Sequence, residues 1–589
     1  MQRTAGSGNE KSLMSSKWCI TASRLRRNDN LNAKETQKNR LRALDRRQRF
    51  IFRCLEIAGS LRQERDLLCV ISIAHETLLF RLRDACVIQI RNLLANQISK
   101  FSTKPTRFQE EPSEREMMQV LENIQQAISS LDLQKRYFLA ISTAGIGGLL
   151  LYRAWTKKSQ KISVGDGWWR TEEKPLTEDR TIRPFVVETS KEMLEDLYRR
   201  IDQTRYTDSL QDCRFHYGFN STYLKKVTSY WRHEFNWERQ VKVLNKYPHF
   251  KTNIEGIDVH FIHVKPVQRK AGQKVVPLIM VHGWPGSFYE FYRILPMLTE
   301  TEEDVVFEVI CPSIPGYGYS EAPHVQGFNT LDAARIFHKL MERLEFSEYY
   351  LQGGDWGGFI SCNMAQIKPE CVKGLHLNMI NARAGSTLTI FCLLVGRYLP
   401  FLVGFTREDV RRLYPYMQKN VYDLLKESGY LHIQATKPDT AGCAVNDSPV
   451  GLAAYILEKF STWTDYKNRD LEDGGLERKF SLDDLLTNIM IYWTTGSITP
   501  SMRFYKENMG KDFHKRVDNV AKIYVPTGLA AFPHELIHCP WVWASSKFRD
   551  IRSYTYMPRG GHFAAFEEPE LLAQDLLQFV KKVESKKAK

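Results

Sequence analysis

The chain has 589 residues, of which 43% are hydrophobic, so it is long enough for more than one ordinary domain and can bury a sizeable core. The net charge is +15, but residues 1–136 hold 25 basic and 15 acidic residues and therefore account for +10 of it. The charge thus gives no reason to expect an acidic partner such as nucleic acid for the remaining chain. Eleven cysteines without paired spacing argue against a disulfide scaffold and favour a reducing, cytosol-facing environment.

Residues 1–136 form a basic extension for which the sequence predicts helices. Residues 41–60 and 77–100 show helical periodicity with Arg and apolar side chains mixed. A contact with nucleic acid or acidic lipid is one interpretation, and a solvated helical surface is the default one. The early stretch lacks the apolar region of a secretory signal peptide. Met117 and Met118 offer later starts, so the presence of this segment in the working protein stays open.

The uncharged run at residues 137–152 predicts a membrane anchor. It is short for a span, which needs about 20 apolar residues. Arg153 can snorkel, and Ala154 and Trp155 can extend the anchor to residue 155. More Lys and Arg residues follow the run than precede it, which places the following chain on the cytosolic side. A buried core helix is the alternative interpretation.

A Gly-containing loop follows the first predicted core strand. Residues 156–275 precede it and are too rich in aromatic residues for a disordered linker. The apolar run at 276–281 predicts a short buried strand, and His-Gly-Trp-Pro-Gly follows at once. Pro285 biases the backbone of Trp284 toward extended conformations, which helps fix the direction of its N–H. We expect His282 to be structural.

The most informative motif is Gly-Gly-Asp-Trp-Gly at residues 353–357, between an apolar run and a helix-like stretch. Strand, sharp glycine turn and helix are the context of the α/β-hydrolase nucleophile elbow, usually G-x-S-x-G. Asp355 occupies the nucleophile position, and a carboxylate there opens an electrophilic sp³ carbon and becomes an alkyl ester. In this fold the N–H groups of Trp356 and Trp284 would form the oxyanion hole. Taken alone, the motif also fits an ordinary turn with a solvated Asp.

Candidates for activating water lie near the C-terminus. His562 is in a Gly-rich loop after a strand-like segment, and Glu535 follows another strand and turn. This gives the order nucleophile, acid, histidine. Asp518 is a rival for the acid, but it precedes that strand instead of following it. We interpret Glu567 and Glu568 as solvated charges at the start of a helix.

Together, the elbow, the His-Gly-Trp-Pro loop and the Gly-Gly-His-Phe tail resemble the epoxide hydrolases. Longer stretches resemble the microsomal members of that family: Gly-Asp-Gly-Trp-Trp at 165–169, Arg-Phe-His-Tyr-Gly-Phe-Asn at 214–220 and Tyr-Trp-Thr-Thr-Gly at 492–496. The resemblance covers residues 137–582, and its motifs are long and ungapped. The family's anchor normally begins the protein, so residues 1–136 depart from its pattern.

The resemblance implies hydrolysis of apolar epoxides to vicinal diols, with Tyr430 and Tyr505 as proton donors. A phenol is neutral near pH 7 yet acidic enough to share its proton with an alkoxide. Asp355 would attack the epoxide, and His562, oriented by Glu535, would activate the water that hydrolyses the ester. No metal or organic cofactor is expected. Without the family, either tyrosine would be taken as a packing residue.

The resemblance also implies an α/β-hydrolase fold with a helical cap. The expected parts are the extension at 1–136, the anchor at 137–155, an N-terminal wrapping region at 156–275, the first half of the hydrolase core at 276–385, the cap at 386–515, and the second half of the core with a basic tail at 516–589. The expected location is the endoplasmic reticulum (microsomal) membrane, with the catalytic part facing the cytosol. Membrane lipid is an expected partner and nucleic acid is not. The preferred epoxide and the oligomeric state stay open.

Several alternatives remain at this point. The apolar run at residues 388–395 is expected either to line the substrate pocket or to pack as a buried cap helix. A haloalkane dehalogenase also uses an Asp nucleophile followed by tryptophan, but it holds a halide with indole N–H groups and has no need of Tyr430 and Tyr505. A membrane-anchored binder of apolar ligands would keep the fold as a scaffold and make no use of Asp355.

Overall fold

The computed structural model describes residues 162, 164–266, 270, 272–382, 386–510 and 516–587. The predicted basic extension and membrane anchor lie outside the described residues. Among the helices that are described, none is both long and apolar enough to cross a bilayer.

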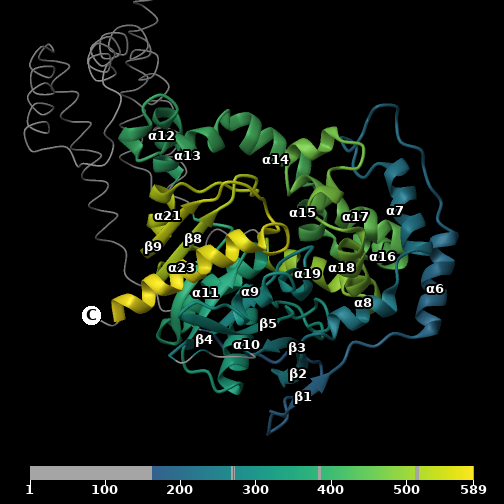
Figure 1. Ribbon diagram of the computed structural model, residues 1–589, viewed down its shortest axis with the longest axis horizontal. Helices are drawn as coiled ribbons and strands as arrows, with labels where there is room; N and C mark the ends of the chain where they lie inside the picture. Colours follow the sequence, from purple (N-terminus) through teal and green to yellow (C-terminus); the bar gives the residue numbers. More distant parts are fainter. Residues whose placement is uncertain are drawn as a thin grey trace, which may run out of the picture. The chain divides into compact units, whose positions relative to one another are not determined.

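Within the described residues, nine strands form one mixed sheet in the order β1-β2-β3-β5-β4-β6-β7-β8-β9 (Figure 1). The strands from β1 to β5 along this order pair antiparallel, and those from β5 to β9 pair parallel. The carboxyl ends of the parallel strands therefore meet at one edge, where ligands of open α/β sheets bind. The strand bounds are β1 (Ile182–Phe185), β2 (His249–Ile254), β3 (Ile257–Val264), β4 (Lys274–Val281), β5 (Val305–Pro312), β6 (Tyr349–Gly353), β7 (Val372–Leu377), β8 (Ile523–Ala531) and β9 (Phe548–Tyr556).

Helices cover both faces of the parallel part of the sheet. All five residues of β6 are buried, although their side chains alternate between the two faces. This explains why the central strands are continuous apolar runs and do not alternate with polar residues. The covering elements are η1 (Phe288–Phe291), α9 (Leu295–Thr299), α10 (Thr330–Arg343), α11 (Asp355–Ile367), η2 (Pro369–Cys371), α20 (Val517–Val520), α21 (Trp541–Lys547), α22 (Ala564–Glu567) and α23 (Pro569–Lys587).

Three helices precede the hydrolase core and pack against the cap. They are α6 (Lys191–Asp202), α7 (Ser221–His233) and α8 (Trp237–Leu244). Each begins at a side-chain cap that satisfies free N–H groups of the first turn, from Ser190, Asn220 and Asn236 in turn. Helix α6 contacts α17 and helix α8 contacts α18, so this region supports the cap from outside.

The chain between β7 and β8 forms a helical cap. Its elements are α12 (Ser386–Gly396), η3 (Pro400–Val403), α13 (Arg407–Leu413), the π-helix η4 (Gln418–Tyr422), α14 (Asp423–Glu427), α15 (Gly429–Thr436), α16 (Pro438–Asp447), α17 (Pro449–Thr462), η5 (Tyr466–Asp470), η6 (Leu476–Arg478), α18 (Leu482–Thr495) and α19 (Ile498–Asn508). Helices α15 and α16 both pack on α19.

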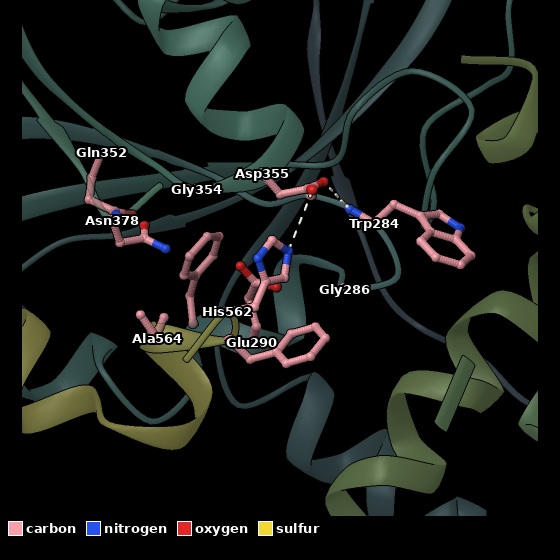
Figure 2. A pocket seen from close by; sticks show the side chains of 13 residues that line it. Trp284, Gly286, Glu290, Gln352, Gly354, Asp355, Asn378, His562 and Ala564 are labelled. Carbon is pink, nitrogen blue, oxygen red and sulfur yellow. Dashed lines mark hydrogen bonds and ion pairs between the residues drawn. The ribbon is translucent and has the colours of Figure 1, made fainter. Parts of the chain in front are cut away.

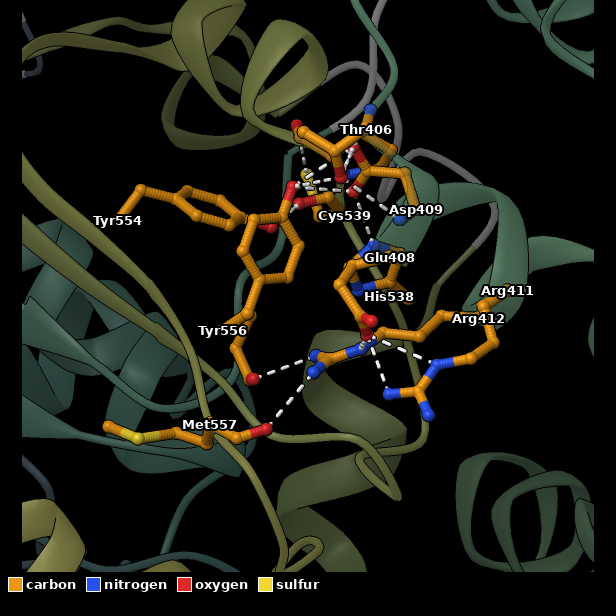
Figure 3. A network of polar contacts seen from close by, with 12 residues as sticks. Thr406, Glu408, Asp409, Arg411, Arg412, His538, Cys539, Tyr554, Tyr556 and Met557 are labelled. Carbon is orange, nitrogen blue, oxygen red and sulfur yellow. Dashed lines mark hydrogen bonds and ion pairs between the residues drawn. The ribbon is translucent and has the colours of Figure 1, made fainter. Parts of the chain in front are cut away.

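A polar network holds the beginning of the cap against the sheet (Figure 3). Asp409 of α13 is buried, bonds to His538 Nε2 at 2.7 Å and accepts from the hydroxyl of Tyr556 at 2.9 Å. Arg412, one turn further along α13, donates to the carbonyl of Ala531 at 2.7 Å. Ala531 and Tyr556 end β8 and β9, so α13 is fixed to the edge where the parallel strands terminate.

Helix α12 differs from the expectation that residues 388–395 form a buried cap helix. Leu388, Ile390, Phe391 and Leu394 are between 42% and 54% exposed, whereas Cys392 is buried against the core. The helix is therefore not buried as a whole, and that expectation is wrong. Leu393 and Val395 are half-buried against the core, and the expectation that the run lines the substrate pocket stays a prediction. Apolar composition predicts the helix but does not say what covers it.

Candidate active site

Asp355 sits in a strained turn between β6 and α11. Its φ of 47° is in the left-handed region, which non-glycine residues occupy at an energetic cost. The backbone is crowded around it, because a Cβ on Gly357 would lie 1.8 Å from the carbonyl oxygen of Val281. A Cβ on Gly353 would lie 2.5 Å from the carbonyl oxygen of Gly357. Both positions therefore require glycine, and the strand, turn and helix predicted from the motif are present.

The two predicted oxyanion donors flank the Asp355 side chain. The N–H of Trp284 donates to Asp355 Oδ1 at 2.8 Å (Figure 2). A Cβ on Gly283 would lie 2.3 Å from that same oxygen, so the loop can approach the carboxylate only with glycine there. Trp356 is the second residue of α11, and its N–H is one of the first-turn donors that a helix leaves unpaired. The positive end of the helix dipole also favours the negative charge on Asp355.

His562 and Glu535 complete a triad with Asp355. The loops after β8 and β9 bring them together: His562 Nδ1 is 2.7 Å from Glu535 Oε1, and His562 Nε2 is 3.4 Å from Asp355 Oδ2. Side-chain exposure is 2% for His562 and 3% for Glu535, so water screens this pair little. The histidine thus lies between two carboxylates, one that orients it and one that it faces across the site.

The charge of His562 depends on both carboxylates. Burial by itself lowers the pKa of His562, but the charges and hydrogen bonds of Glu535 and Asp355 outweigh burial and raise that pKa well above its ordinary value. In the resting site His562 is therefore a cation between two anions. Removal of the Asp355 charge would take away part of what keeps it protonated.

Tyr430 and Tyr505 project from cap helices α15 and α19 toward the elbow. The Tyr430 ring stacks on the Trp284 indole at 5.1 Å and 3°. The Tyr505 ring meets the edges of Trp284 and Trp356 at 5.8 and 4.8 Å. The two tyrosine rings are 5.9 Å apart, so both phenols lie on the cap side of Asp355.

Both phenols keep their protons. Burial, and after it the negative charge of Asp355, raise the pKa of Tyr430 well above its usual range. Burial and the neighbouring Tyr430 and Asp355 do the same for Tyr505. The Tyr505 hydroxyl is buried and has no hydrogen-bond partner in the described part of the chain. A ligand oxygen placed there would therefore meet a free donor.

Comparison with known proteins gives a consistent result. Residues 182–291 match the family model "Epoxide hydrolase N terminus", and residues 276–520 match the model "alpha/beta hydrolase fold". The chain is 59% identical to epoxide hydrolase 1 of Oryctolagus cuniculus over 76% of this chain and 99% of that protein. It is 60% identical to epoxide hydrolase 1 of Sus scrofa over 75% of this chain and 98% of that protein. The chain belongs to the epoxide hydrolase family.

A solved structure supports the same fold for this epoxide hydrolase. The juvenile hormone epoxide hydrolase of Bombyx mori superposes with a TM-score of 0.69 at 41% identity, over 72% of this chain and 99% of that one. The α/β-hydrolase fold expected from the elbow is therefore confirmed. The catalytic roles of the individual residues stay predictions, and the geometry above is what supports them.

The prediction for Glu567 and Glu568 is wrong, because both side chains are buried. Glu567 Oε1 accepts hydrogen bonds from the N–H groups of Gly561 at 3.0 Å and Phe563 at 3.1 Å. Burial raises the pKa of Glu567 from its ordinary 4.5 to about 8. In the sequence, Glu567 is distinguished only by its position four residues after Phe563, which places it at the end of α22. That position alone does not predict that its side chain is buried.

Glu568 is held by two cations, one of them in the loop that carries His562. It pairs with Lys479, and its other oxygen lies 2.8 Å from Arg559. Asp518, the rival acid, lies 2.9 Å from Arg516 and accepts from Asn363, so it belongs to a separate cluster.

A small cavity touches the catalytic groups and was not anticipated. It measures about 20 Å³ and is lined by Asp355, His562, Gly286, Glu290 and Ala564 among others (Figure 2). One water needs about 10–15 Å³, so the cavity can hold one. Burial, offset by His562 and reinforced by Asp355, raises the pKa of Glu290 to about 8. Glu290 therefore presents a neutral carboxylic acid to this cavity.

His282 is structural, as expected. It is fully buried, and its Nε2 accepts from the N–H of Ile314 at 3.2 Å. Burial lowers the pKa of His282 to about 4, so it stays neutral and braces the loop before Trp284.

Proposed function

We propose that this epoxide hydrolase converts apolar epoxides into vicinal diols through a covalent ester on Asp355. One observation carries the proposal: the Asp355 carboxylate lies where the Trp284 N–H, the His562 imidazole and two protonated phenols converge. The groups needed to open an epoxide come from the cap and the elbow. The groups needed to hydrolyse an ester come from the loops of the core.

Ring opening uses Asp355 and the two tyrosines. Oδ1 is held by the Trp284 N–H, which leaves Oδ2 as the attacking atom and makes Oδ1 the future carbonyl oxygen. As the new C–O bond forms, the ring C–O bond breaks and its electron pair stays on the epoxide oxygen. Tyr430 and Tyr505 stabilise that oxygen, and one of them transfers its proton to it.

Ester hydrolysis uses His562 and Glu535. Esterification neutralises Asp355, so one of the charges that raise the pKa of His562 is lost. The imidazolium gives up its proton, which restores the phenol that protonated the epoxide oxygen, and the neutral imidazole can then act as the base. His562 then takes a proton from a water, which attacks Cγ of the ester. The N–H groups of Trp284 and Trp356 stabilise the oxyanion on Oδ1, worth on the order of 10²–10³ in rate per donor. Collapse breaks the bond between Cγ and the ester oxygen, the expelled alkoxide takes the proton of the Asp355 carboxyl group, and the diol leaves the regenerated carboxylate.

Glu290 extends this account to the position of the water. Its carboxyl lines the same cavity as His562 and Asp355, on the core side of the carboxylate. A neutral carboxylic acid can both donate to and accept from one water molecule. Glu290 is therefore a positioning residue for the hydrolytic water and acts through His562.

A haloalkane dehalogenase remains the second candidate on one observation. The indole N–H groups of Trp284 and Trp356 are buried and have no hydrogen-bond partner among the residues described. A halide site would need both to point at one spot beside Asp355. Figure 2 instead shows the Trp284 indole directed away from Asp355. The paired phenols and the family favour an epoxide.

The decisive experiment is a single turnover of an aryl epoxide in ¹⁸O-labelled water with the protein in excess. The proposal predicts label in the Asp355 carboxylate and an unlabelled oxygen added to the first diol, because the enzyme supplies that oxygen. A labelled diol with unlabelled Asp355 would show direct attack by water and overturn the nucleophile assignment. Halide release without diol formation would favour the second candidate.

We also propose that residues 137–155 anchor the chain in the endoplasmic reticulum membrane, with the catalytic part on the cytosolic side. The support is the uncharged run and the Lys and Arg residues that follow it. The test is carbonate extraction of the full chain and of a variant lacking 137–155, with protease protection of sealed vesicles. Full protection of the catalytic part would overturn the orientation.

A further inference from the structure

One surface of the cap collects exposed apolar side chains. Of the 25 large hydrophobic side chains that lie exposed in the described residues, 12 fall between residues 388 and 433. They are Leu388, Ile390, Phe391, Leu394, Tyr398, Phe401, Leu402, Met417, Val421, Tyr422, Leu425 and Ile433, and we call them the cap face. Contiguous exposed apolar surface on this scale marks a binding site more often than chance.

The cap face lies on neighbouring elements, because Tyr414 donates to the carbonyl of Leu393 and Asn420 donates to the carbonyl of Leu413. Helix α12 packs on η3, and η4 runs directly into α14. Figure 1 shows α12, α13 and α14 along one edge of the described protein, on the far side of the cap from α16 and α18. Helix α12 has no charged residue in its 11 positions. The exposed side chains of α12 are therefore apolar or uncharged.

The charges around the cap face are mainly basic. Between residues 388 and 433 most of the exposed charged side chains are basic: Arg397, Arg407, Arg411, Lys419 and Lys426, with Glu408 paired to Arg411 at 2.6 Å. The acidic residues of the same stretch are less exposed, and Asp409 and Glu427 are engaged by His538 and Arg469. The surface of this stretch therefore presents mainly cations and apolar groups.

This combination fits a lipid bilayer. Apolar side chains flanked by Lys and Arg are typical of surfaces that insert at the boundary between headgroups and acyl chains. Anionic headgroups attract the cations, and tyrosine rings prefer the same boundary. Tyr398 and Tyr422, 75% and 52% exposed, stand on the cap face beside its aliphatic residues. We propose that the cap face rests in the interface of a membrane that contains anionic phospholipid.

Two helices connect the cap face to the core or to the active site: α13 through hydrogen bonds to the strand ends, and α14 through the next helix, α15. The polar network of Asp409 and Arg412 fixes α13 to the sheet, so the cap face is held in one place relative to the core (Figure 3). Helix α14 ends at Glu427, and α15, which carries Tyr430, begins at Gly429. A lipid in contact with α14 would therefore lie beside α15, the cap helix that carries Tyr430 over the nucleophile. Delivery of apolar epoxide from the bilayer rests on the proposed function, but the lipid contact does not.

The test is photo-crosslinking of the full chain in proteoliposomes of phosphatidylcholine, with or without phosphatidylserine. Phe391, Leu394 and Phe401 are replaced one at a time by benzoylphenylalanine (for example Phe391→benzoylphenylalanine). Matched controls place the same group at Tyr217, which is 80% exposed in the wrapping region, and at Tyr524, which is 61% exposed on β8. Mass spectrometry identifies what each probe captures.

The proposal predicts lipid adducts at the three cap-face positions and none at the controls, with yield several-fold higher when phosphatidylserine is present. Adducts to a second copy, or to residues 1–155 of the same chain, would show that protein covers the cap face and would overturn the proposal. Equal lipid capture at the controls would overturn it as well. These outcomes do not depend on whether the protein opens epoxides.

A second measurement separates the lipid contact from catalysis. A Phe391→Ser/Phe401→Ser variant, which leaves the active-site residues intact, should turn over a water-soluble epoxide at the wild-type rate. With an epoxide that partitions into vesicles, its KM should rise several-fold while kcat is unchanged. An equal KM for both proteins in the presence of vesicles would contradict delivery through the membrane even if the lipid adducts form.

Discussion

Glu567 holds the loop that carries His562 from both sides. One of its carboxyl oxygens accepts from the N–H groups of the residues before and after the histidine, at 3.0 and 3.1 Å. Because burial raises its pKa to about 8, Glu567 is neutral at physiological pH. It therefore fixes the catalytic base without adding a third negative charge. The protonation of His562 therefore depends on Asp355 and Glu535.

Variants of Glu567 should separate the effect of its two hydrogen bonds from the effect of its protonation. Glu567→Gln keeps a neutral acceptor for the two N–H groups, so kcat at neutral pH should stay within about twofold of wild type. Glu567→Ala leaves both N–H groups unpaired and should destabilise the protein by about 1–3 kcal/mol. The Ala variant should also lower kcat, because the His562 loop loses its support. Urea unfolding and steady-state kinetics measure both, and an Ala variant with unchanged stability and kcat would contradict this role.

The pH dependence of stability provides a second check on Glu567. Its pKa is about 8 when folded against an ordinary 4.5, so the folded protein holds one more proton than the unfolded chain between these values. The free energy of unfolding should therefore fall as pH rises from about 4.5 to about 8. Glu567→Gln removes this contribution, so its stability relative to wild type should increase across that window. A constant difference between the two proteins would contradict the raised pKa.

Removal of the base should trap the ester. In His562→Gln, Asp355 can still attack, but no imidazole activates water, so kcat should fall by about 10²–10⁴. Intact-mass analysis after mixing with epoxide should show protein plus one substrate. Asp355→Asn/His562→Gln is the control and should show no adduct. An adduct on the control would place the nucleophile elsewhere.

Tyr505→Phe should separate catalysis from stability. The Tyr505 hydroxyl is buried with no partner in the described structure, so its removal should leave the free energy of unfolding unchanged or slightly higher. Ester formation should nevertheless slow by about 10²-fold, and by more in Tyr430→Phe/Tyr505→Phe. Stopped-flow tryptophan fluorescence can follow the step, because Trp284 and Trp356 contact the phenols.

Tyr492→Phe is the matched control for that experiment. The Tyr492 hydroxyl donates to the carbonyl of Gly286 at 2.8 Å, so its loss should cost about 0.5–1.5 kcal/mol of stability. It should slow ester formation far less than Tyr505→Phe. Equal slowing by the two variants would mean that Tyr505 only packs.

Glu290 should act on hydrolysis and not on ring opening. Glu290→Gln mimics the neutral acid and should keep the rate of ester decay at neutral pH, whereas Glu290→Ala should slow it and leave ester formation unchanged. In the wild type the decay rate should fall above about pH 8, where Glu290 ionises and opposes the oxyanion. The Gln variant should lack this fall. Single-turnover decay between about pH 7 and pH 9 tests both, and identical profiles would exclude the role.

The local chain determines the parts of the site that the sequence predicts well. Gly353 and Gly357 are required by crowding within the elbow itself, so their spacing around Asp355 is visible in the sequence. The acid and base follow from the order of strands and loops in the fold. Tyr430 and Tyr505 came only from the resemblance, because helices α15 and α19 bring them together from positions 75 residues apart.

Burial of charge and exposure of apolar groups could not be predicted in the same way. Glu567 and Glu290 look like ordinary surface carboxylates in the sequence, and only the packing around them makes them neutral. Helix α12 has the composition of a buried helix, yet Ile390 and Phe391 are more than half exposed. In each case the environment is made by segments distant in the chain, and no local pattern encodes it.

Trp284 belongs to both halves of the enzyme at once. Its N–H holds the nucleophile of the core, and its ring is stacked against Tyr430 of the cap. If the cap moved away from the core, Trp284 would lose its ring contact with Tyr430. The residue whose N–H positions the nucleophile is therefore also the residue on which a proton donor packs, so a substitution of the Trp284 side chain would disturb the acid and the nucleophile together.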